Sequence, residues 1–157
     1  MSDDPTKSPL WPTDSPAVIA YINLLQGIIN RLANNSASCK TWCLALVGAL
    51  LSFAGTTRIP GIVTFALVPV VIFGFLDMMY LAQERAYRDL FGRVMGLIRK
   101  GELKREHIFD ARAPLKFRDV VPALCSWSIF PIYLTLVAGY IVVAAAGWLA
   151  PLTGKMT

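Results

Sequence analysis

The sequence is poor in the residues that build metal-binding and catalytic sites. It contains one histidine, His107, and three cysteines, of which Cys39 and Cys43 stand one helical turn apart while Cys125 is distant. A structural zinc site needs about four such ligands at suitable spacing, so we expect no metal, no cofactor and no disulfide framework. No nucleophile and base stand together in a recognisable active-site pattern, which argues against an enzyme.

Charge is also scarce and unevenly placed. Charged residues make up 16% of the 157-residue chain and hydrophobic residues 55%, which disfavours an ordinary soluble domain. Three stretches carry no charge at all: residues 41–57, 59–76 and 120–154. The N-terminus is acidic and rich in proline, unlike a signal peptide, and we expect residues 1–14 to form a flexible tail.

Residues 15–36 have the pattern of an amphipathic helix. Ser15 can cap the first backbone N–H groups, and Pro16 suits the first helical position. Apolar side chains then recur at helical spacing, at Val18, Ile22, Leu25, Ile29 and Leu32. Such a helix can lie in a membrane interface or pack on another helix of its own chain, and the sequence leaves both open.

The first two uncharged stretches predict a transmembrane hairpin over residues 37–83. They hold 17 and 18 residues, near the lower limit for a membrane-crossing helix, and residues 58–61 between them are typical of a tight turn. A buried hairpin of a soluble protein is the alternative, which the apolar character of all faces disfavours. Antiparallel helices that turn near residue 58 place Lys40 level with Asp77. We therefore predict an ion pair between them at one membrane boundary.

Beyond Asp77 the second helix should continue to Lys100 and end at Gly101, because no glycine or proline signals an earlier break at the boundary. Residues 84–119 then form a charged cytosolic helix and linker, with ten of the fifteen basic residues and six acidic ones. Interspersed acidic residues argue against a nucleic-acid partner. Glu84, Arg85 and Arg88 join the predicted boundary charges, and Glu84 and Arg88 have the i,i+4 spacing of an ion pair. The predicted cytosolic basic face consists of Arg99, Lys100, Lys104 and Arg105.

Residues 120–154 are too long for a single helix that crosses a bilayer directly. Pro122 and Pro131 divide them into an interfacial segment up to residue 130 and a third transmembrane helix over residues 132–150. The aromatic residues of this part suit the interfacial belts, namely Trp127, Tyr133, Tyr140 and Trp148. Surfaces for oligomer or helix packing are predicted at Tyr80, Tyr87, Phe91, Gly139 and Gly147.

The predicted fold is therefore an all-α membrane protein with an N-terminal amphipathic helix, a transmembrane hairpin that continues into a cytosolic helix, and a third, C-terminal transmembrane helix. Because basic residues gather between positions 84 and 119, the positive-inside rule places that segment and the N-terminus in the cytoplasm. The lipid bilayer is the first expected partner.

Two segments carry a resemblance to a family. Residues 35–42 have the form N-S-x3-K-x-W, and residues 73–91 have the form F-x2-L-D-x2-Y-L-x-Q-E-R-x-Y-R-x-L-F. The chain resembles a family of small, largely uncharacterised prokaryotic multi-span membrane proteins, in which an aromatic residue commonly stands where this chain has Gly74. The resemblance implies a helix that leads into two close spans, a charged segment, a final hydrophobic segment and a bacterial inner membrane. By architecture alone, such proteins resemble membrane effectors of anti-phage systems.

Three functions remain open at this point. The first is a homo-oligomeric inner-membrane protein that acts as a pore-forming or membrane-perturbing effector in antiviral defence. The second is a membrane anchor or scaffold that recruits a cytosolic protein partner through residues 99–118. The third is a small ion-coupled transporter that uses Asp77, which ranks last because the spans carry few other polar groups.

Overall fold

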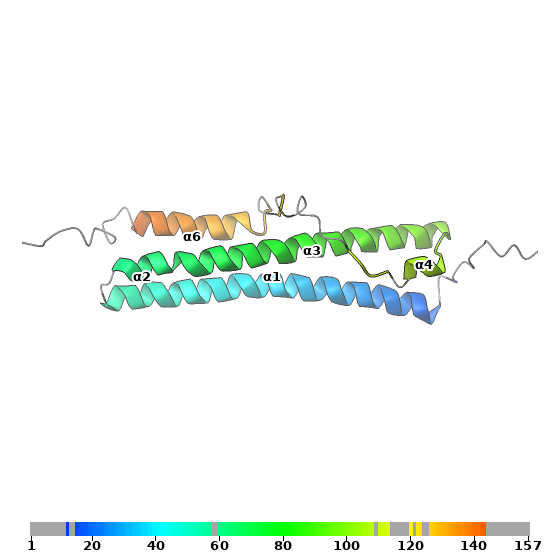
Figure 1. Cartoon of the computed structure of the whole chain (residues 1–157), viewed down its shortest axis with the longest axis horizontal. Helices are drawn as coiled ribbons and strands as arrows, with labels where there is room; N and C mark the ends of the chain where they lie inside the picture. The colour runs from blue at the N-terminus through cyan, green and yellow to red at the C-terminus, as the bar shows by residue number, and fades with distance from the viewer. Residues whose placement is uncertain are drawn as a thin grey trace, which may run out of the picture.

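The chain folds as a long helical hairpin with a shorter helix against one half of it, as the computed structural model shows (Figure 1). The structure describes residue 12 and residues 15–57, 60–108, 110–113, 120, 122–123 and 126–143, without the side chains of residues 60, 105 and 106. Within these ranges the elements are all helices, as the sequence predicts. The predicted tail lies outside the described residues except for residue 12.

The first helix, α1, runs without interruption from Pro16 to Thr57. Its 42 residues make it about 63 Å long. It begins as predicted, with Ser15 Oγ accepting a hydrogen bond from the Val18 N–H at 3.3 Å. Residues 33–40 contain neither glycine nor proline, so the helix passes straight through residue 36. The predicted boundary there is thus a change of surface character and not a break in the backbone.

The return arm consists of α2, Pro60–Phe65, and α3, Leu67–Lys100, which both pack along α1. The hairpin is present, but its second arm is not the single helix that the sequence predicts, because Ala66 interrupts it. Pro69 explains the interruption, since its nitrogen has no hydrogen to donate to the Phe65 carbonyl. The arm ends at Gly101 as predicted, where a φ of 67° gives the left-handed C-cap that favours glycine.

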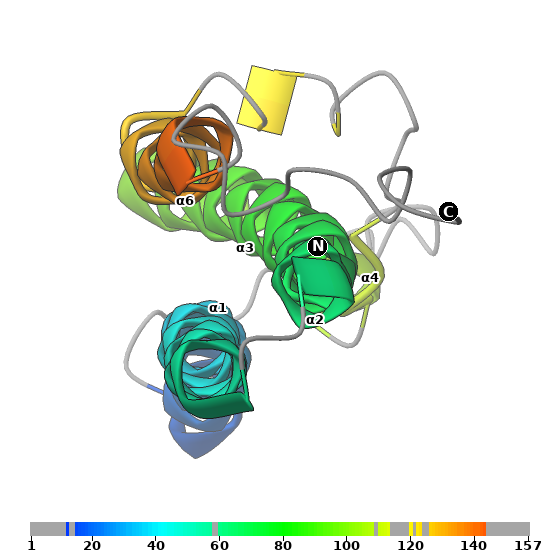
Figure 2. The same cartoon turned by 90° about the vertical axis from the view of Figure 1, so that its left-hand side faces the viewer.

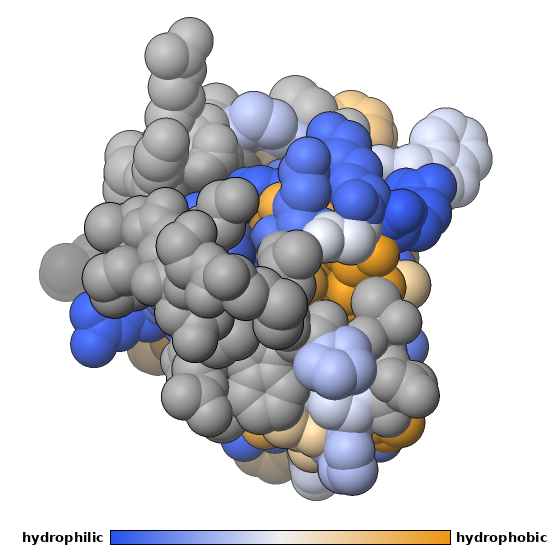
Figure 3. All heavy atoms as spheres, turned by 90° about the vertical axis from the view of Figure 1, so that its right-hand side faces the viewer, coloured by the Kyte–Doolittle hydropathy of each residue, from blue (hydrophilic) through white to orange (hydrophobic). Residues whose placement is uncertain are grey.

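The end of the hairpin that carries both the start of α1 and the end of α3 has its own hydrophobic core. The core consists of Val18, Tyr21, Leu25, Val94, Leu103 and Ile108. Ile108 ends the short helix α4, Arg105–Ile108, which packs near α1. The predicted amphipathic helix therefore buries its apolar stripe against its own chain. Figure 3 looks at this end and shows hydrophilic side chains around a smaller hydrophobic area.

The last described helix, α6, spans Phe130–Val143 and lies beside α3 along the other half of the hairpin. Figure 2 shows α3 between α1 and α6. The start of α6 is fixed by the Ser126 carbonyl, which accepts hydrogen bonds from the N–H groups of Ile129 and Phe130. The described helix has 14 residues, about 21 Å, and the remainder of the predicted third span, with Gly147, lies outside the described residues.

Candidate functional site

Three polar or charged side chains are buried among the described residues: Ser36 on α1 and Asp77 and Glu84 on α3. Asp77 is completely inaccessible, with 0% of its surface exposed. An isolated carboxylate in such a position is very costly, so it needs a positive partner and hydrogen-bond donors. The structure supplies both from α1.

Lys40 and Ser36 together bind the Asp77 carboxylate. The Lys40 Nζ atom lies 2.8 Å from both Asp77 oxygens and donates a hydrogen bond to Oδ1. It also donates to Ser36 Oγ at 2.9 Å, and the Ser36 hydroxyl in turn donates to Asp77 Oδ1. The structure thus brings together Lys40 and Asp77, the pair that the sequence predicts, in a three-residue cluster.

The geometry follows from helix spacing and from the position of the turn. Ser36 and Lys40 are four residues apart, so they lie on one face of α1, and the antiparallel hairpin sets Asp77 opposite them. The two segments that carry the family resemblance, residues 35–42 and 73–91, therefore meet at this cluster. Sequence reasoning missed Ser36, although its i,i+4 spacing to Lys40 was a usable signal.

Tyr133 on α6 reaches the same cluster and was also missed. The prediction placed Tyr133 in an interfacial belt and assigned it no contact, whereas the structure buries its hydroxyl oxygen beside Asp77. Its ring packs over Gly74 of α3, where an added Cβ would lie 3.4 Å from two ring carbons. A side chain larger than that of alanine at position 74 would displace this ring, and no local sequence signal linked the two residues.

The other predicted boundary charges do not join this cluster. Arg88 binds Glu84 through Nε and one terminal nitrogen, both 2.7 Å from Oε1, as the i,i+4 spacing predicts. Arg85 instead donates to Ser126 Oγ at 2.8 Å and lies 3.5 Å from the Pro122 carbonyl. Arg85 therefore connects α3 to the segment that precedes α6, whereas the prediction grouped it with the charges at the membrane boundary.

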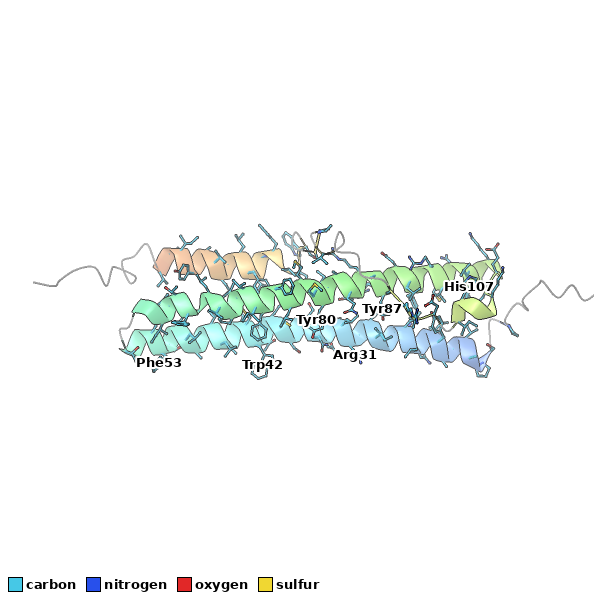
Figure 4. The ribbon with its side chains drawn as sticks, viewed as in Figure 1. Arg31, Trp42, Phe53, Tyr80, Tyr87 and His107 are labelled. Carbon is cyan, nitrogen blue, oxygen red and sulfur yellow. The ribbon has the colours of Figure 1, made fainter. Side chains whose placement is uncertain are left out.

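The residues of the predicted packing surfaces and of the predicted basic face lie in different parts of the structure. Tyr80 and Tyr87 lie on the side of α3 that faces α1 (Figure 4). Tyr87 and Phe91 pack against the hydrophobic core that contains Val94. Gly139 is exposed and lines an apolar groove of about 180 Å³ between α1, α3 and α6. Arg99, Lys100 and Lys104 are exposed near the end of α3, while the Arg105 side chain lies outside the described residues.

A long-range hydrogen bond joins the start of α1 to the segment that follows α4. The Tyr21 hydroxyl on α1 donates to the Asp110 carbonyl at 2.9 Å. Burial raises the pKa of Tyr21 above its ordinary value, and the charge of Asp110 adds to that rise. Because a raised pKa favours the neutral hydroxyl in the folded state, this contribution to stability is fully present below about pH 10 and is lost above it.

The cluster at Asp77 joins α1 to α3 through an ion pair and hydrogen bonds. Among the described residues no group of three or more His, Cys, Asp and Glu side chains could hold a metal ion. Two helical stretches, Pro16–Thr57 and Gly61–Lys100, are long and apolar enough to cross a membrane. Comparisons of the chain with protein families, with curated proteins and with solved structures find no match.

Proposed function

We propose that this chain is the subunit of a homo-oligomeric bacterial inner-membrane protein that forms a pore or perturbs the bilayer. The half of the hairpin near residue 58 crosses the membrane together with α6, and the half with α4 lies in the cytosol. The setting expected from the family resemblance, an effector of anti-phage defence, is part of the same proposal.

The exposed side chains support the membrane placement. Large apolar residues cover the outside of the half near residue 58, including Trp42 at 62% exposure, Phe65 at 68% and Val71 at 69%. Figure 4 shows Trp42 and Phe53 projecting outward from α1. A soluble monomer rarely exposes so much continuous apolar surface, whereas lipid accommodates it. Trp127, which is 91% exposed, precedes α6 and follows Ser126, whose hydroxyl accepts a hydrogen bond from Arg85 two turns beyond Asp77. An exposed aromatic there suits the headgroup region next to the boundary.

One observation carries the proposal of a homo-oligomer: a stripe of small residues on the outer face of α1. The small-residue stripe consists of Thr41, Ala45, Gly48, Ser52 and Gly55. Their spacings of four, three, four and three keep them on one side of the helix, and all five are exposed. A Cβ added at Gly48 or Gly55 would meet nothing within 4 Å, so this face is unoccupied in the subunit.

A small-residue stripe in a membrane helix allows another helix to approach closely. The hydroxyls of the stripe are already satisfied within α1, since Ser52 donates to the Gly48 carbonyl and Thr41 to the Ala37 carbonyl. They can therefore face either a neighbouring helix or water without leaving a donor unpaired. A ring of α1 helices would use this face for contact between subunits and for the wall of a pathway.

The long cytosolic half favours a second function, a membrane anchor that recruits a cytosolic protein. From Met78 to Lys100, α3 extends about 35 Å beyond the Asp77 level and carries exposed Arg93, Arg99 and Lys100. This half would serve as the docking surface in the anchor and as the sensing surface in the effector. Permeability of the bilayer distinguishes the two functions.

The test is to add bulk to the small-residue stripe. We expect the wild-type protein to form a defined oligomer by native mass spectrometry and to release dye from liposomes. Gly48→Leu should weaken assembly and leakage by about tenfold, because it holds neighbouring helices apart. The matched control is Leu46→Phe, which adds bulk at another exposed position about 160° around α1.

The outcomes separate the proposals. A wild-type protein that is monomeric and does not leak contradicts the effector. An oligomer that leaves the bilayer tight while it captures a cytosolic protein favours the anchor. Equal effects of Gly48→Leu and Leu46→Phe would show that the small-residue stripe is not the subunit contact.

A further inference from the structure

Two buried polar atoms in the bundle have no hydrogen-bond partner among the described residues: Asp77 Oδ2 and the Tyr133 hydroxyl oxygen. Lys40 lies 2.8 Å from Oδ2 and compensates its charge, but it directs its hydrogen bonds to Oδ1 and to Ser36. A buried donor or acceptor that stays unpaired is costly, so such groups are nearly always satisfied. Here the Tyr133 ring packs against Gly74 and against the cluster that contains Met78, and these two residues flank Asp77 on α3.

The backbone around these atoms is arranged to bring them together. Gly74, one turn before Asp77 on α3, leaves the space in which the Tyr133 ring lies. The ring contacts two separate hydrophobic clusters, one around Met78 and Ala82 and one around Cys43 and Val70. Tyr133 is therefore the point at which α6 meets both arms of the hairpin.

The rest of α6 is loosely held. No residue of α6 between Phe130 and Val143 is fully buried. Two grooves that are open to the surface lie between α6 and α1: one of about 180 Å³ lined by Gly139, and one of about 300 Å³ lined by Leu44 and Pro131. Such grooves leave α6 with few packing contacts. A helix with few buried side chains is expected to detach before the rest of the fold opens.

We propose that the Tyr133 hydroxyl donates a hydrogen bond to Asp77 Oδ2 and thereby latches α6 to the hairpin. The latch makes Tyr133 a positioning residue that keeps α6 closed over the Lys40 and Asp77 pair. Release of α6 then uncovers the side of α1 and α3 that carries the grooves. The latch deepens the proposed function, because it names α6 as the element that moves when the assembly opens. Its effect on permeability rests on that proposed function.

The latch is tested by a distance measurement that does not depend on leakage. Spin labels are placed on Leu46→Cys in α1 and Leu134→Cys in α6, two exposed positions, with Cys125 replaced by serine and the buried Cys39 and Cys43 retained. Pulsed electron paramagnetic resonance in liposomes then reports the separation of α6 from the hairpin. Tyr133→Phe removes one oxygen atom and should raise the separated fraction about tenfold, as expected for the loss of a hydrogen bond to a charged group.

The matched control is Tyr140→Phe, which makes the same change two turns further along α6 and should leave the distances unchanged. Identical distance distributions for wild type and Tyr133→Phe would overturn the latch, and so would equal effects of the two substitutions. If α6 separates in Tyr133→Phe while the bilayer stays tight, the latch stands and the proposed pore fails. If the bilayer leaks with α6 unmoved, the pore stands and the latch fails.

Discussion

Asp77 fixes the position of α3 relative to α1. A fully buried carboxylate is tolerated here because an ammonium group and a hydroxyl both reach it from α1. The pair contributes less to net stability than its short distances suggest, since both charges had to leave water. Its larger effect is on register: sliding α1 along α3 by one turn would leave both charges without a partner.

At this scale we expect a severe effect from removing one charge. Asp77→Ala should lower the free energy of unfolding in detergent by about 3–5 kcal/mol, because it leaves the Lys40 ammonium group poorly solvated. The control Asp89→Ala removes an exposed carboxylate from the same helix and should change stability by less than about 0.5 kcal/mol.

A double-substitution cycle tests the pairing itself. Lys40→Ala combined with Asp77→Ala should be milder than the sum of the single substitutions, since no charge is left uncompensated. Strict additivity would show that the two side chains do not depend on each other.

The arrangement of the helices could be read from the sequence only where the signal was local. Ser15 and Pro16 marked the start of α1, Gly101 marked the end of α3, and the position of the turn placed Lys40 opposite Asp77. Pro69 carried a signal for the interruption at Ala66, but the continuous apolar run concealed it. The docking of α6 through Tyr133 and Gly74 could not be predicted, because the two residues are 59 positions apart and neither is unusual in its own surroundings.

Gly74 offers a test of how the elements fit together. Gly74→Ala should be tolerated, because its Cβ would reach the Tyr133 ring at 3.4 Å, an ordinary contact. Gly74→Leu would push the ring away and should destabilise the fold by about 1–3 kcal/mol. The control is Gly92→Leu, since Gly92 is an exposed glycine of α3 with nothing within 4 Å of its added Cβ. Thermal unfolding in detergent measures all three, and equal losses at positions 74 and 92 would argue against the contact.

As a whole, the molecule is divided along its length into an apolar half and a polar half, and the apolar half is short. The uncharged residues of α1, Thr41 to Thr57, span about 26 Å, whereas the hydrocarbon core of a typical bilayer is about 30 Å thick. A span shorter than the core is accommodated by thinning of the surrounding bilayer, by snorkelling of flanking residues or by oligomerisation. The mismatch agrees with the proposal of a protein that perturbs its membrane.

Bilayer thickness should therefore govern incorporation. We expect the protein to enter phosphatidylcholine vesicles with short acyl chains more completely than vesicles with long chains, as measured by flotation on a density gradient. A polyleucine peptide long enough to match the thicker bilayer should show the opposite preference. Equal incorporation at every chain length would contradict the mismatch.

The unbroken course of α1 has a mechanical consequence. Between Tyr21 and Gly55 the helix is continuous, so in the proposed topology a single helix connects the cytosolic end of the protein with the bilayer. In the proposed assembly, a rotation of α1 where Tyr21 meets Asp110 would turn the helix face that carries Gly48. A cytosolic partner that bound only this end would then change the proposed contact between subunits without entering the lipid.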